Sequence, residues 1–216
     1  MRSTAIKYPP PLASLSAQAF TWTVSKLLWF IQYRHTENIP QDLESGLLIT
    51  PNHQTYFDPF WVCVPIRRKM RFMAWAAAFD WFFVGPLIRY LGAFPVTYDV
   101  GGTKNAMKEA LKSLRDGATL TIFPEGGREL PDGELLEFKP GAVRIAMQAG
   151  VPILPVTIRG AHRVWTREMK YPKFFRRVEI IYHPVFEVPE PGEGVDLHDH
   201  LEKLTAKLKG IIESAM

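Results

Sequence analysis

The sequence predicts an α/β fold in which a mixed, largely parallel sheet is flanked by helices and preceded by an N-terminal amphipathic helix. Two observations lead to the sheet. Short apolar runs of strand length alternate along the chain with segments of helical periodicity. Polar loops follow several of these runs, and neighbouring parallel strands are usually joined through a helix. The alternation is therefore typical of a parallel sheet covered by helices.

The bounds of the expected elements follow from apolar spacing and from the glycines and prolines between the runs. For example, Gly101–Gly102 opens one helix and Asp116–Gly117 stops it. Strands are expected at residues 47–50, 71–75, 93–97, 118–123, 153–158 and 178–183. Helices are expected at residues 58–65, 81–91, 103–115, 140–148 and 197–212, the last of them facing solvent.

The N-terminal helix is expected at residues 14–33, after the Pro9–Pro11 breaker, and contains Trp22, Trp29 and a single charge, Lys26. Its serines, threonines and glutamine make it too polar to span a bilayer, while tryptophan favours the interface between lipid and water. Packing on the domain core is the alternative. We expect an N-terminal helical segment at residues 1–36, associated with a membrane, and a domain at residues 37–216.

Net charge and cysteine content restrict which partners and which cellular compartment are expected. The 216 residues carry a net charge of +4, which fits an anionic partner such as a lipid headgroup, a phosphorylated metabolite or a nucleic acid. A single cysteine, Cys63, excludes an intrachain disulfide and a cysteine-rich metal site, which suits a reducing compartment. Neither a signal sequence nor a run of 18 apolar residues is present, so no transmembrane span is expected.

Two polar loops carry side chains that could act in catalysis or bind a ligand. His53 and Asp58 follow the strand expected at 47–50, and a carboxylate that accepts from one ring nitrogen would leave the other as a general base. Asp58 as a plain helix N-cap is the alternative. After the strand at 118–123, Gly126, Gly127 and Arg128 suit an anion such as phosphate. Because loops at strand ends meet in α/β sheets, we expect both in one cleft.

The neighbouring groups restrict the chemistry further. Glu125 is expected either to hold its loop or a nearby cation, or to contact substrate directly. A Gly-x-Ser-x-Gly nucleophile motif is absent from the sequence, and Cys63 lies in an apolar helix without an activating neighbour. Direct transfer is therefore favoured over a covalent acyl-enzyme.

The motifs resemble those of the glycerolipid acyltransferase family typified by 1-acylglycerol-3-phosphate acyltransferase. Asn52 precedes the His-x-x-x-x-Asp pair, and Phe-Pro-Glu-Gly-x-Arg spans residues 123–128. Residues 92–96 resemble the second family block and residues 151–156 the fourth. The similarity runs in order from about residue 38 to residue 164.

The resemblance implies that His53, oriented by Asp58, deprotonates an acceptor hydroxyl, which then attacks an acyl thioester. The donor would be acyl-CoA or acyl-carrier protein, and the acceptor a lysophospholipid. Glu125, Gly126 and Arg128 match residues that bind the acceptor phosphate, with Asn52 and Gly127 beside them as substrate-binding candidates. Neither a metal nor a redox cofactor is expected. The implied enzyme is peripheral, on the cytoplasmic face of a membrane, with no nucleic acid as partner.

One departure leaves the acceptor open, because Tyr98 stands where family members usually carry an arginine after the second block. Tyrosine cannot supply the missing charge to a phosphate. Either Arg89, Arg159 or Arg163 compensates, or the acceptor is a lyso-lipid other than a phosphatidate precursor. An acyl thioester hydrolase and a catalytically silent lipid- or nucleic-acid-binding module are further alternatives.

A basic and aromatic segment favours a lipid surface. Residues 159–177 contain seven arginines and lysines against one acid, Glu168, and four aromatic residues lie among them. Such a mixture suits an anionic bilayer, although single-stranded nucleic acid or a solvated loop would also accommodate it.

Overall fold

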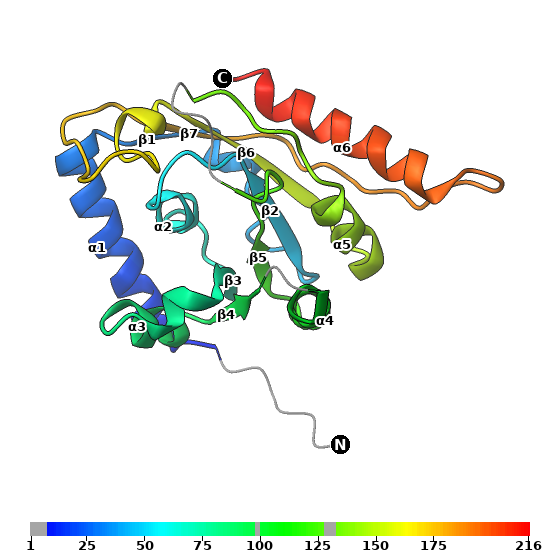
Figure 1. Cartoon of the computed structure of the whole chain (residues 1–216), viewed down its shortest axis with the longest axis horizontal. Helices are drawn as coiled ribbons and strands as arrows, with labels where there is room; N and C mark the ends of the chain where they lie inside the picture. The colour runs from blue at the N-terminus through cyan, green and yellow to red at the C-terminus, as the bar shows by residue number, and fades with distance from the viewer. Residues whose placement is uncertain (1–7, 98–99, 128–132) are drawn as a thin grey trace.

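A seven-stranded sheet runs through the computed structural model, which describes residues 8–97, 100–127 and 133–216 (Figure 1). Its strand order is β1-β7-β6-β2-β5-β3-β4, and β6 and β7 form the one antiparallel pair among the described strands. The strands are β1 (Gln32–Arg34), β2 (Leu47–Pro51), β3 (Met70–Trp75), β4 (Ala93–Val96), β5 (Thr119–Thr121), β6 (Ile153–Arg159) and β7 (Glu179–Tyr182). The expected mixed, largely parallel sheet is confirmed.

Helices cover both faces of this sheet (Figure 1). On one side lie α1 (Pro11–Trp29), α2 (Asp58–Cys63) and α3 (Val84–Tyr90). On the other lie α4 (Val100–Arg115), α5 (Gly141–Ala149) and α6 (Leu197–Glu213). The short 3₁₀ helices η1 (Thr36–Asn38), η2 (Ala76–Asp80) and η3 (Ala161–Arg163) lie between these elements.

The central strand β2 explains why there are two apolar cores. All five of its residues are buried, and successive side chains of a strand point to opposite faces. Leu47 and Ile49 therefore join a core with α1 and α2, while Leu48 joins a core with α4, α5 and α6. A continuous apolar run of this kind is typical of a parallel strand covered on both faces.

The terminal helix α6 does not simply face solvent, as the sequence had suggested. Leu201, Thr205, Leu208 and Ile212 are buried along one stripe, at the spacing of an amphipathic helix. Asp196 caps its start by accepting from the backbone N–H groups of residues 198 and 199. The prediction failed because the charged residues spread along the helix drew attention from its apolar stripe, which decides its packing.

The helix expected at residues 14–33 begins and ends earlier. Pro11 occupies its first turn, where the missing N–H costs no hydrogen bond. Phe30 adopts a left-handed conformation with φ of 47°, which ends the helix after Trp29. The chain then forms β1, which pairs with β7 in parallel, so residues 32–34 of the expected N-terminal segment are part of the sheet.

The inward face of α1 contains polar as well as apolar side chains. Ser25 is buried, and Gln18 donates hydrogen bonds to the carbonyls of Cys63, the last residue of α2, and of Ile66 just beyond it. Trp29 is buried near the C-terminal end of the helix. Six large apolar side chains in and next to the helix are exposed: Leu12, Leu15, Phe20, Trp22, Leu27 and Phe30. Among the described residues, no helix combines the length and apolarity that crossing a membrane requires.

Candidate active site

His53 and Asp58 are in contact in the loop that joins β2 to α2. The His53 Nδ1 lies 2.9 Å from Asp58 Oδ2, and the same oxygen accepts from the backbone N–H groups of Gln54 at 2.5 Å and Thr55 at 2.7 Å. The N-cap position is Phe57, so Asp58 does not act as the helix N-cap. Its fully buried carboxylate instead organises the loop that precedes the helix.

The contact with Asp58 determines which nitrogen of His53 is available for chemistry. The Asp58 carboxylate accepts a hydrogen bond from Nδ1–H, which leaves Nε2 with its lone pair in the neutral ring. Nε2 makes no hydrogen bond within the described residues, and the side chain is 18% exposed. The ring also stacks on Phe123, which follows β5, with centroids 4.0 Å apart and planes 26° apart. His53 is therefore fixed in the orientation that a general base needs.

Asn52 was expected to bind substrate, and its side chain makes hydrogen bonds within the protein. Its side chain is fully buried, where its amide donates to the Ile158 carbonyl at 2.9 Å and accepts from the Ile158 N–H at 2.6 Å. These two bonds join the end of β2 to β6. Asn52 thus supports the loop that carries His53, and its polar atoms are used within the protein.

Glu125 lies on the second predicted loop, and its carboxylate binds the backbone of the His53 loop and of the segment that leads into α5. One carboxylate oxygen accepts from the His53 N–H at 2.7 Å, and the other accepts from the Leu136 N–H at 2.9 Å. Burial raises the pKa of Glu125 to about 7, against the opposing effect of these two hydrogen bonds. Among the described residues Glu125 forms no ion pair, so of the two roles expected for it the geometry corresponds to holding the loop.

The Gly126–Gly127 turn lies beside a cation that sequence reasoning missed. Gly126 has φ of +68°, and its N–H donates to the Phe123 carbonyl at 3.1 Å. Lys139 lies so close that an alanine Cβ at position 126 would come within 2.9 Å of its Nζ. Lys139 is exposed and lies far from the turn in sequence, so its proximity could not be predicted from the motif.

Gln54 is a second residue that sequence reasoning missed. It is buried next to His53, and its Nε2 donates to the Gly133 carbonyl at 3.2 Å. Its Oε1 accepts from the N–H groups of Ala161 at 3.0 Å and His162 at 3.3 Å. Because Ala161 follows β6, this amide fixes three loops relative to one another at the same edge of the sheet. Its position directly after the histidine was the only available signal.

The arginines expected to bind phosphate differ in their contacts and in their distance along the fold from the His53 loop. Arg128 and Tyr98 lie outside the described residues. Arg159 is in an ion pair with Glu179, and the Arg89 guanidinium lies over the Phe79 ring, 5.2 Å from its centroid. Arg163 belongs to η3, the element whose N–H groups bind Gln54. Of the three arginines considered as compensation, Arg163 lies on the element that is directly linked to the His53 loop.

The one cysteine is unsuited to attack a thioester. Cys63 is buried, and burial raises the pKa of its thiol to about 12. A protonated thiol without access to solvent is a poor nucleophile. Among the described residues no group of three or more histidine, cysteine, aspartate or glutamate side chains is arranged to hold a metal ion.

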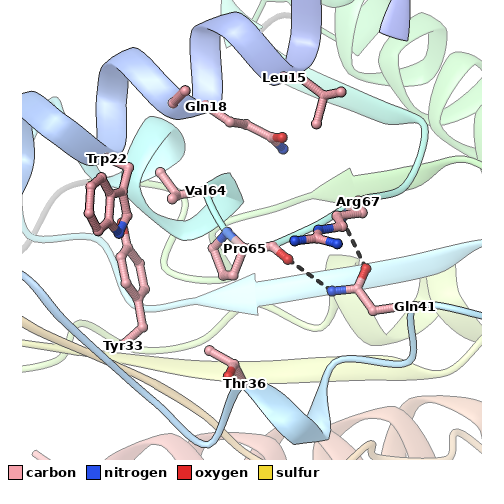
Figure 2. Close-up of a pocket in the computed structure, with 10 residues that line it drawn as sticks. Leu15, Gln18, Trp22, Tyr33, Thr36, Gln41, Val64, Pro65 and Arg67 are labelled. Carbon is pink, nitrogen blue, oxygen red and sulfur yellow. Dashed lines mark hydrogen bonds between the residues drawn. The ribbon is translucent and has the colours of Figure 1, made fainter. Parts of the chain in front are cut away.

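A groove of about 600 Å³ lies away from His53, beneath α1 (Figure 2). Its walls include Leu15 and Trp22 of α1 and the segment around Pro65, where Gln41 hydrogen-bonds to the Pro65 carbonyl and the Arg67 N–H. The residues that line it belong neither to the His53 loop nor to the Glu125 loop. The base is therefore presented at the strand ends rather than inside this groove.

Comparison with known proteins gives consistent matches. The family model described as Acyltransferase matches residues 30–159. A 1-acyl-sn-glycerol-3-phosphate acyltransferase of Streptococcus pneumoniae is 34% identical over 140 residues, which cover 62% of this chain and 50% of that protein. The chloroplastic 1-acyl-sn-glycerol-3-phosphate acyltransferase BAT2 of Brassica napus is 28% identical over 129 residues, 59% of this chain and 37% of its own. The chain thus spans between about a third and a half of these two relatives.

The fold also matches a solved structure. The crystal structure of PlsC from Thermotoga maritima, a 1-acyl-sn-glycerophosphate acyltransferase, aligns with a TM-score of 0.70 and 24% sequence identity. The alignment covers 93% of this chain and 79% of the other. At this identity the similarity establishes a common fold.

Proposed function

The chain belongs to the Acyltransferase family, and from that premise we propose that it transfers a fatty acyl group from an acyl thioester to the hydroxyl of 1-acylglycerol 3-phosphate. The observation that carries the proposal is the contact between His53 Nδ1 and Asp58, which leaves Nε2 as a base. The names of the curated relatives support this choice of acceptor.

The reaction would proceed by direct transfer. His53 Nε2 takes the proton of the acceptor hydroxyl while the oxygen attacks the thioester carbonyl carbon. The tetrahedral intermediate collapses with cleavage of the carbon–sulfur bond, and the imidazolium returns its proton to the leaving thiolate. Buried Asp58 stabilises the imidazolium between the two steps. The protonated, buried thiol of Cys63 supports a mechanism without an acyl-enzyme.

Acceptor phosphate would bind beside the Gly126–Gly127 turn. Both glycines are exposed, so their backbone can approach an anion closely. Lys139, next to Gly126, supplies a positive charge that offsets the absence of arginine at position 98. Arg128 completes this set as a sequence-based candidate.

Replacing Lys139 tests this placement. We expect Lys139→Ala to raise the KM for 1-acylglycerol 3-phosphate by roughly tenfold and to change kcat little, because a charge on the phosphate binds ground and transition states alike. Lys203→Ala, at an exposed lysine on α6, is the matched control and should leave both constants unchanged. An unchanged KM in Lys139→Ala would place the phosphate elsewhere.

The enzyme would act at the cytoplasmic surface of a membrane, where its amphiphilic acceptor resides. Aromatic residues of the basic segment pack against the end of α1, with Trp29 and Phe174 centroids 5.6 Å apart and Phe30 and Phe175 centroids 6.1 Å apart. Exposed apolar and basic groups thus lie side by side, which suits an anionic bilayer. The free Cys63 fits the reducing side.

A lipid panel tests the proposed reaction directly. The purified protein is given labelled acyl-CoA or acyl-carrier protein, with 1-acylglycerol 3-phosphate or with zwitterionic and uncharged lyso-lipids. We expect labelled phosphatidate as the main product with at least one donor, and the faster donor identifies the thioester. Equal or faster transfer to the other lyso-lipids would refute the acceptor. Thiol release that does not require an acceptor would indicate a hydrolase.

A further inference from the structure

The turn that leads into α3 presents two adjacent phenylalanines to solvent. Phe82 is 84% exposed and Phe83 is 82% exposed, and their rings touch edge to face with centroids 4.8 Å apart. Trp81, Leu87 and Tyr90 around them are also exposed. Contiguous exposed apolar patches mark interaction sites, because water penalises them.

The backbone beneath this turn holds the phenylalanines outward. Gly85 packs so closely on Phe79 that an added Cβ would lie 2.1 Å from the Phe79 carbonyl oxygen. The Gly85 N–H donates to the Trp81 carbonyl at 2.8 Å, and Ile88 is the other buried residue of α3. The contacts of Gly85 with Phe79 and Trp81 thus hold the turn in place. The exposure of the two rings therefore follows from the fold of the backbone.

We propose that the Trp81–Val84 turn inserts into the bilayer as an anchor separate from the basic segment. This inference rests on the proposed membrane function. Pro9 and Leu91 line one small cavity, so α1 starts near the end of α3, while Trp29 at its other end packs on Phe174 (Figure 1). A helix of 19 residues is about 28 Å long. Two anchors at its two ends would fix how the molecule sits on a surface.

The charge distribution favours a lipid bilayer over a protein partner. Basic residues dominate the segment 159–177 beside α1. Acidic residues dominate the segment 187–202, which leads into α6 on the opposite side of the sheet (Figure 1). These two segments thus differ in charge, and the basic and aromatic one is available to an anionic surface. Around the turn, tryptophan and tyrosine flank the phenylalanine tip, as at membrane interfaces.

Charge at the turn itself is balanced. Asp80 and Arg89 are the only charged residues between positions 75 and 90. Insertion of the turn would therefore depend on apolar burial, whereas attachment of the basic segment would depend on anionic lipid. The two anchors should respond differently to salt and lipid composition.

Vesicle binding by the full chain separates these contributions. Phe82→Ser/Phe83→Ser should lower partitioning onto phosphatidylcholine–phosphatidylglycerol (3:1) vesicles by at least roughly tenfold, because each ring loses apolar burial. The loss should persist in high salt. Val195→Ser/Leu197→Ser, at exposed apolar positions beside and in α6, is the matched control and should bind like wild type. Unchanged binding of the phenylalanine variant would overturn the anchor.

A fluorescent label locates the turn relative to the lipid. Cys63 is buried, so Phe82→Cys provides a single reactive thiol for an environment-sensitive dye. We expect a blue shift in emission on adding vesicles, and no shift for the same dye at Val195→Cys. The absence of a shift at position 82 would overturn insertion. So would a phenylalanine variant that turns a dimer into a monomer in gel filtration while vesicle binding is unchanged.

Activity distinguishes failure of this inference from failure of the proposed function. With a short-chain, water-soluble acceptor, Phe82→Ser/Phe83→Ser should match wild type, whereas with acceptor embedded in vesicles it should be slower. Equal rates on embedded acceptor would overturn the anchor. If wild type transfers nothing to any acceptor yet binds vesicles through the turn, the proposed function fails and the anchor stands.

Discussion

The helices on the two faces of the sheet distribute their apolar residues in opposite ways. On one face, α6 turns Leu208 and Ile212 into the core and leaves charged residues outside, as expected of a helix in water. On the other face, α1 turns Gln18 toward α2 and exposes Phe20 and Leu27.

If the protein acts at a membrane as proposed, the two faces meet different surroundings. The outward residues of α4, α5 and α6 suit water, whereas those of α1 and α3 suit an apolar medium. The candidate base lies on the second side, because the His53 loop continues into Phe57, whose ring centroid is 4.9 Å from that of Trp29. An enzyme for a lipid acceptor would place its base on this side.

Paired truncations should give the largest difference between the faces. Leu208→Ala removes a fully buried side chain and should lower the free energy of unfolding by about 2–5 kcal/mol. Phe20→Ala removes a larger side chain that is exposed, and should change it by less than about 0.5 kcal/mol. Urea unfolding without lipid measures both. Similar losses in the two variants would mean that Phe20 packs in the free protein.

Glu125 lies in the loop after β5, and its carboxylate accepts a hydrogen bond from the backbone of the His53 loop. Its pKa is higher in the folded protein than the ordinary 4.5, so folding favours its protonated form. The associated stability is present below pH 4.5 and is lost as pH rises to about 7, at most about 3 kcal/mol. Glu125→Gln cannot titrate and should lack this dependence.

Unfolding curves of wild type and Glu125→Gln across this pH range test the assignment. We expect the stability of wild type relative to the variant to fall between pH 4.5 and 7 and to stay constant above. Loss of an acceptor for one N–H offsets the two curves by a constant amount and leaves this slope intact. A difference that does not vary with pH would contradict the raised pKa.

A smaller effect is expected from the polar inward face of α1. Gln18→Ala removes two hydrogen bonds to the carbonyls of Cys63 and Ile66 and should cost about 1–2 kcal/mol of unfolding free energy. Ser16→Ala, at an exposed position of the same helix, should be nearly neutral. If the two substitutions have equal effects, the inward polar contact does not hold α1 on the sheet.

Local patterns predicted most helices and strands and their order along the chain. They predicted less well which face of each helix is buried. The His53–Asp58 contact spans five positions at a strand end, so the loop alone could suggest it. The partners of Asn52 and Glu125 could not be found this way, because Ile158 lies 106 residues from Asn52 and His53 lies 72 residues from Glu125. Through these long-range bonds both residues support the loop that carries His53.

The N-terminal region shows a second limit of the sequence. Apolar residues crowd α1, and crowding does not reveal which of them will face the core. The short strand β1 was missed because its three residues, Gln-Tyr-Arg at 32–34, carry no apolar strand pattern, and its partner β7 lies near the other end of the chain. Tertiary pairing decided both outcomes.

The most direct test of the account is the rate of acyl transfer to 1-acylglycerol 3-phosphate by His53→Ala. Loss of the base should lower kcat by about 10²–10⁴-fold, while the urea midpoint and far-ultraviolet circular dichroism stay near wild type. A folded His53→Ala protein that transfers acyl groups within a few-fold of the wild-type rate would contradict the assignment of His53 as the base.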